Sequence, residues 1–153
     1  MTTKQAFTPT EWDQVLEAPP SASLLVVTAQ RGGTFRETIA IGKFYAEARQ
    51  RHGESELLDE IVAAKPEVDH TRYHSPDELK EHALAHVRDA VALLDAKATA
   101  EEQAAYKQFV IGLAERVASA HREHGDAADN VSDAERAAID SIRSALGSDT
   151  PPA

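Results

Sequence analysis

Two histidines in this sequence have the spacing of a chelating pair. His82 and His86 are four residues apart, so in a helix they lie one turn apart on the same face. Imidazole binds transition metals such as zinc, and Glu78 or Asp89 on the same helical edge could add an oxygen ligand. Imidazole also suits the edge of an apolar stripe, where its polar tip pairs with neighbouring carboxylates. Two interpretations remain: a transition-metal or hydrolytic site, and the edge of a structural helix, which we prefer.

Two glutamates occupy matching positions in widely separated segments. Residues 34–41 and 132–139 share an N-cap hydroxyl, a glutamate three residues later (Glu37 or Glu135) and an isoleucine seven residues after the cap. Apolar residues then follow at helical spacing, which places each carboxylate on the apolar face of its helix. Such a glutamate can simply cap the helix, and this is the preferred interpretation. Alternatively, both carboxylates turn inward to hold a hard cation such as Ca²⁺ or Mg²⁺, which needs several oxygen ligands.

The helix that carries the histidine pair has the clearest start signal in the chain. Ser75 as N-cap, Pro76 at the first helical position and Glu78 form a capping box. Apolar residues recur at helical spacing through residues 75–98. This segment is therefore predicted to be a core helix.

The other helices are expected from similar signals. Capping pairs, glycines and prolines predict helices over residues 8–18, 21–30, 34–51, 54–65, 99–124 and 132–146. Pro19-Pro20 should separate the first two, because proline removes a helical N–H group and disfavours helical backbone before it.

The predicted fold is an all-α, single-domain bundle of six to seven helices, with a pseudo-twofold relation where the two glutamate segments match. Strand signals are nearly absent from the sequence. We expect a flexible arm over residues 1–7, a helical domain over 8–147 and a disordered tail over 148–153.

The composition narrows the function classes. The chain has 153 residues, a formal net charge of −10 and no cysteine. Its excess of acidic residues disfavours nucleic-acid binding, because phosphate is repelled. Without cysteine there are neither disulfides nor thiolate metal sites. No apolar run approaches the roughly 20 residues of a membrane-spanning helix. We expect a soluble cytoplasmic protein without membrane insertion.

Common catalytic motifs are missing. The sequence has neither HExxH nor the paired Glu-x-x-His motifs of di-iron bundles, and its glycine pair at 32–33 is not followed by a P-loop lysine. No catalytic residue and no organic cofactor are therefore predicted.

The segment around the second glutamate resembles a known family. Residues 128–139, ADNVSDAERAAI, are similar to the signature of TerB-like domains of the tellurite-resistance group, in which a loop aspartate precedes a glutamate that opens a helix. That family is all-helical, pseudo-twofold and associated with acidic metal sites and bacterial stress systems. The resemblance implies Asp129, Glu135 and Glu37 as candidate cation ligands. Gln30-Arg31-Gly32 stands where the first half would carry its loop aspartate.

Three function classes follow. The preferred one is a non-enzymatic helical interaction or regulatory module, resembling TerB-like stress-response domains, that acts through an unknown protein partner or as a homodimer. The second is a divalent-cation-binding module that uses Glu37, Asp129 and Glu135 with Ca²⁺ or Mg²⁺. The third is a zinc or hydrolytic site at His82 and His86.

Overall fold

The computed structural model describes residues 3–29, 34–51, 53, 55–64, 66, 75–122 and 133–147. These residues contain helices and no strand, which confirms the predicted all-α bundle. The elements are the short 3-10 helix η1 (Lys4–Ala6) and the helices α1 (Pro9–Ala29), α2 (Thr34–Gln50), α3 (Glu56–Ala63), α4 (Pro76–Lys97), α5 (Ala100–Arg122) and α6 (Asp133–Leu146). The predicted tail over 148–153 lies outside the described residues.

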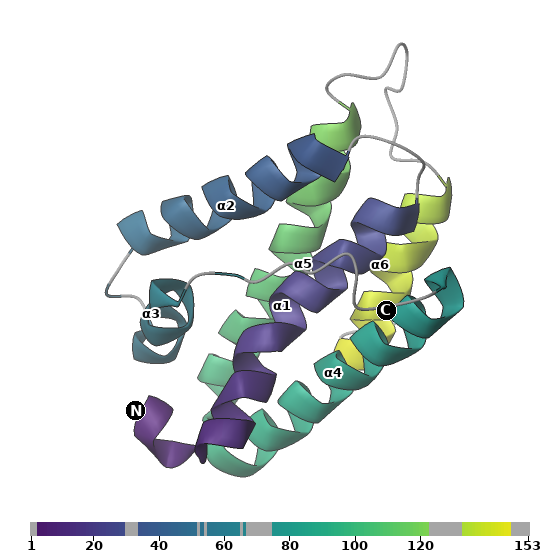
Figure 1. Ribbon diagram of the computed structural model, residues 1–153. Helices are drawn as coiled ribbons and strands as arrows, with labels where there is room; N and C mark the ends of the chain where they lie inside the picture. The colour runs from purple at the N-terminus through teal and green to yellow at the C-terminus, as the bar shows by residue number, and fades with distance from the viewer. Residues whose placement is uncertain are drawn as a thin grey trace, which may run out of the picture.

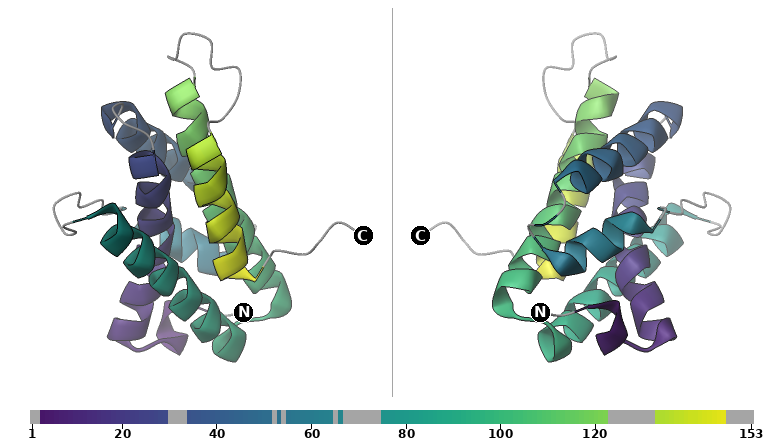
Figure 2. Two further views of the ribbon diagram at one scale, coloured as in Figure 1. Left: turned by 90° about the vertical axis from the view of Figure 1, so that its right-hand side faces the viewer. Right: turned by 90° about the vertical axis from the view of Figure 1, so that its left-hand side faces the viewer.

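Helix α1 runs through the middle of the bundle (Figure 1). It packs most extensively against α4 and also contacts α5 and α6, whereas α2 and α3 pack against each other and against α5 (Figure 2). Apolar side chains from all six helices form one continuous core. No described helix combines the length and apolar character that crossing a bilayer requires.

The prediction that Pro19-Pro20 ends the first helix is wrong, because α1 continues through both prolines. Pro19 has no N–H group to donate to the carbonyl of Val15, four residues earlier. The hydroxyl of Tyr106 on α5 donates to that carbonyl instead, at 2.8 Å, and both residues are fully buried. The first two predicted helices are therefore parts of one helix, Pro9–Ala29, in which a tertiary contact replaces the hydrogen bond that Pro19 removes.

Most helix starts follow the predicted caps. The capping boxes of Thr8 with Glu11 and of Thr99 with Glu102 are both complete. In each, the backbone amides of the two residues donate to the partner's side chain over 2.8 to 3.2 Å. These bonds satisfy amides that have no acceptor inside the helix. The predicted cap Ser132 lies outside the described residues.

The helix ends are also close to expectation. Helix α3 is shorter than the predicted 54–65, because Ser55 is its N-cap and Ala64 its C-cap. Gly53 and Gly147 have positive φ angles of 106° and 72°, so they adopt the left-handed backbone that glycine permits after a helix.

The described part of the expected arm over residues 1–7 packs on the domain. Residues Lys4–Ala6 form η1, and Phe7 is buried with its ring centroid 5.6 Å from that of Trp12. The ammonium of Lys97, at the end of α4, donates to the backbone of this segment at 2.9 Å and lies 5.5 Å from the Phe7 ring centroid. Residues 3–7 are thus tied to both α1 and α4.

Candidate functional site

The predicted histidine pair lies at the edge of the interface between α4 and α1. His86 is half-buried, and its Nδ1 lies 3.3 Å from the hydroxyl oxygen of Ser21 on α1. His82, one turn earlier, is exposed. Among the residues that the structure describes, no group of three histidine, aspartate or glutamate side chains is placed to hold a metal ion.

Of the three predicted acidic ligands, the structure describes one side chain. Glu135, in the first turn of α6, is only 3% exposed, which agrees with the inward orientation expected from its spacing. Glu37 lies in the first turn of α2, but its side chain is outside the described part of the chain, as is the whole of Asp129.

A pocket of about 380 Å³ opens between α2, α3 and α5. We call it the α2–α3–α5 pocket. Its apolar wall consists of Phe44 and Ala48 from α2, Leu58 and Val62 from α3, and Ala105 and Phe109 from α5. The two residues from each helix are four positions apart, so each pair lies on one face of its helix.

Small residues leave the space that the pocket occupies. The walls carry only a methyl group at Ala48 and at Ala105, and α5 has no side chain at Gly112. A Cβ atom at Gly112 would lie 3.3 Å from the tip of the Phe44 ring, so this glycine allows the ring to approach α5 closely. The Phe44 ring also packs against Phe109, with 5.3 Å between their centroids. The Phe44 side of the pocket is therefore packed directly against α5, at Phe109 and Gly112.

Two of the polar side chains in the pocket wall hold the turn that leads into α3. Asp59 accepts a hydrogen bond from the backbone amide of Gly53 at 3.0 Å, and the Ser55 hydroxyl accepts one from the amide of Leu58 at 3.3 Å. The guanidinium of Arg51, which is exposed, forms no ion pair or hydrogen bond with another described residue. Arg51 is thus the cation of the wall, beside the Asp59 carboxylate, and its N–H donors remain for a ligand.

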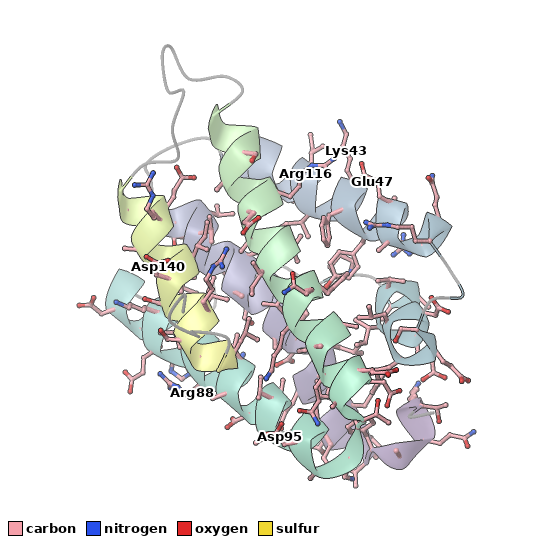
Figure 3. The ribbon with its side chains drawn as sticks, turned by 180° about the vertical axis from the view of Figure 1, so that it is seen from behind. Lys43, Glu47, Arg88, Asp95, Arg116 and Asp140 are labelled. Carbon is pink, nitrogen blue, oxygen red and sulfur yellow. The ribbon has the colours of Figure 1, made fainter. Side chains whose placement is uncertain are left out.

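A bidentate ion pair fixes α2 across α5 beside this pocket. Arg116 donates to the two carboxylate oxygens of Glu47 at 3.0 and 2.8 Å. Figure 3 shows these residues together with Lys43 at the junction of the two helices. The hydrogen bond from Arg116 lowers the pKa of Glu47 below its ordinary value. The charge of Arg51 also lowers the pKa of Glu47, so these two side chains attract each other, but the hydrogen bonds of Glu47 go to Arg116.

The pocket was not predicted from the sequence, although the spacing of three of its residues is compatible with it. Phe44, Ala48 and Arg51 are spaced four and three residues apart, which places a cation in line with an apolar pair. The same spacing occurs wherever a helix packs on a core, so it does not by itself indicate a cavity.

Comparison with protein-family models, with curated proteins and with solved structures finds no match to this chain. The site is therefore defined by its own geometry: a small, mainly apolar pocket bounded by three helices, with the Arg51 guanidinium and the Asp59 carboxylate in its wall.

Proposed function

We propose that this chain is a non-enzymatic helical binding module whose recognition site is the α2–α3–α5 pocket. The observation that carries the proposal is the pocket itself. Its volume of about 380 Å³ falls within the ~300–1,000 Å³ of small-molecule sites, and its wall is mainly apolar with few polar groups, as in such sites. A regulatory role, in which occupancy alters contacts with another protein, fits the resemblance to TerB-like stress-response domains.

The polar groups of the pocket favour binding over catalysis. Ser55 and Asp59, which could serve as nucleophile and base in another setting, are engaged with backbone amides of the α3 turn. A nucleophile needs a base within hydrogen-bond reach of its own hydroxyl, whereas Ser55 is the N-cap of α3 and Asp59 accepts from the Gly53 amide.

Titration with a neutral apolar compound tests the proposal. We expect 4-phenylbutanamide to shift the backbone amide resonances of Ala48, Leu58 and Ala105 in ¹⁵N-labelled protein. Ala105→Leu should weaken or abolish these shifts, because the larger side chain takes up part of the space of about 380 Å³ and leucine is a good helix former. Ala104→Leu is the matched control, since Ala104 is the exposed neighbour on α5 and is absent from the pocket wall. Shifts that persist undiminished in Ala105→Leu would refute the assignment of the site.

A second candidate function, divalent-cation binding, is favoured by one observation. Glu135 is buried at the start of α6, so its carboxylate lies on the inward side of the helix, as the cation candidate requires. We propose that it joins Glu37 and Asp129 around Ca²⁺ or Mg²⁺. A ligand that binds only the folded state raises its melting temperature, so millimolar Ca²⁺ or Mg²⁺ should stabilise the wild type and not Glu135→Gln. An unchanged wild-type melting temperature would refute this candidate.

A further inference from the structure

We propose that the ligand of the α2–α3–α5 pocket is a small apolar carboxylic acid, with Arg51 binding its carboxylate. This inference rests on the proposed function, because it names the ligand of the same site. It combines two observations: an apolar cavity of limited volume, and an exposed guanidinium in its wall that attracts the Glu47 carboxylate through its charge but forms no hydrogen bond or salt bridge with a described side chain.

The interior of the pocket selects an apolar group. The rings of Phe44 and Phe109 and the aliphatic side chains of Leu58 and Val62 offer no hydrogen-bond donor or acceptor to a ligand. A polar group placed among them would lose its hydration without compensation, whereas an alkyl or aryl group gains from leaving water.

The wall contains one cation, Arg51, and one carboxylate, Asp59, and the cation can bind an anionic ligand. A guanidinium offers several N–H donors in a planar fork that matches the two oxygens of a carboxylate. The neighbouring carboxylates have other direct hydrogen-bond partners, since Asp59 accepts from the Gly53 amide and Glu47 accepts from Arg116. Asp59 keeps its negative charge, and the charges of Glu47 and Arg51 attract each other. An incoming carboxylate therefore meets Arg51 without displacing an existing ion pair of that side chain.

The size of the pocket favours a free small molecule over a segment of another protein. Its volume of about 380 Å³ lies at the lower end of the ~300–1,000 Å³ range of ligand pockets. Three helices bound it, and its volume is that of a small ligand and not of the long groove that accommodates a helix or an extended peptide.

Two isosteric probes test the proposal. The dissociation constants of 4-phenylbutyrate and of 4-phenylbutanamide should differ about fivefold in favour of the acid, the scale of an exposed ion pair. Arg51→Gln should remove this preference and leave the affinity for the amide unchanged. Lys43→Gln is the matched control: it removes the same charge from an exposed position on α2 that does not line the pocket, and it should preserve the preference.

The outcomes separate this inference from the proposed function. Equal affinities for acid and amide, with Ala105→Leu weakening or abolishing both, would overturn the carboxylate inference and leave the pocket as a binding site. A preference for the acid that survives in Arg51→Gln would also overturn it. If neither probe shifts resonances of pocket residues, the proposed function fails and the inference fails with it.

Discussion

Removing one hydroxyl group, in Tyr106→Phe, should destabilise the protein by about 1–3 kcal/mol, the cost of leaving a buried polar group unpaired. The Tyr106 hydroxyl donates at 2.8 Å to the carbonyl of Val15, and both residues are fully buried. The helix itself cannot supply a replacement, because the residue four positions after Val15 is Pro19. The variant therefore leaves this carbonyl without its donor in the core.

Tyr45→Phe is the matched control. Tyr45 is also almost fully buried, at 2% exposed, but among the described residues its hydroxyl has no hydrogen-bond partner. Burial raises the pKa of this phenol above its ordinary value, because the charged form is the more costly one to desolvate. Removing an unpaired buried hydroxyl should leave the stability unchanged or raise it slightly.

Urea denaturation of both variants at pH 7 measures the difference, and melting temperatures provide a second measure. For a chain of this size, each 1 kcal/mol lowers the melting temperature by about 2–4 °C, so Tyr106→Phe should melt clearly below the wild type. Pro19→Ala restores an N–H group opposite the Val15 carbonyl, so Tyr106→Phe should cost less in that background. Equal losses in Tyr106→Phe and Tyr45→Phe, or an undiminished loss in the Pro19→Ala background, would refute the reasoning.

Three further predictions concern other contacts. Gly112→Ala should stabilise α5 by about 0.5–1 kcal/mol through helix propensity, with the Phe44 ring moving by a few tenths of an ångström to make room for the new methyl group. A lower free energy of unfolding in urea would show that the ring cannot move. Ser75→Ala should cost about 1 kcal/mol, because its hydroxyl caps α4 at the amide of Glu78, whereas an unchanged denaturation midpoint would contradict that role. The pKa of Glu47 is lowered in the folded state from an ordinary 4.5, mainly by the hydrogen bond from Arg116, so the stabilisation from this pair is present above pH 4.5 and is lost as the pH falls through the folded pKa. Glu47→Gln should therefore make stability less sensitive to acid, and an unchanged acid denaturation profile would contradict the assignment.

The fold was predictable to the extent that its signals are local. The caps at Thr8, Ser75 and Thr99 each depend on residues within one turn, and all three are present. The error at Pro19-Pro20 has a different origin. The donor that replaces the proline N–H is Tyr106, which is 91 residues from Val15 in the sequence, so no local pattern could indicate it.

The candidate site likewise has one feature that could be predicted from local sequence and one that could not. The burial of Glu135 was predictable, because its orientation follows from the apolar positions of its own helix. The α2–α3–α5 pocket was not, because Phe44 and Leu58 have the same spacing to their apolar neighbours as ordinary core residues. Only the packing of three helices decides that the space between them remains open.

The central claim is that the α2–α3–α5 pocket binds the apolar part of a small acid. A crystal structure of the protein with 4-phenylbutyrate tests this claim most directly. The predicted complex has the phenyl group against Phe109 and Leu58, and the carboxylate within about 4 Å of the Arg51 guanidinium, the range of an ion pair. An empty pocket at a saturating concentration of the acid, or an acid bound on another face of the bundle, would contradict the claim.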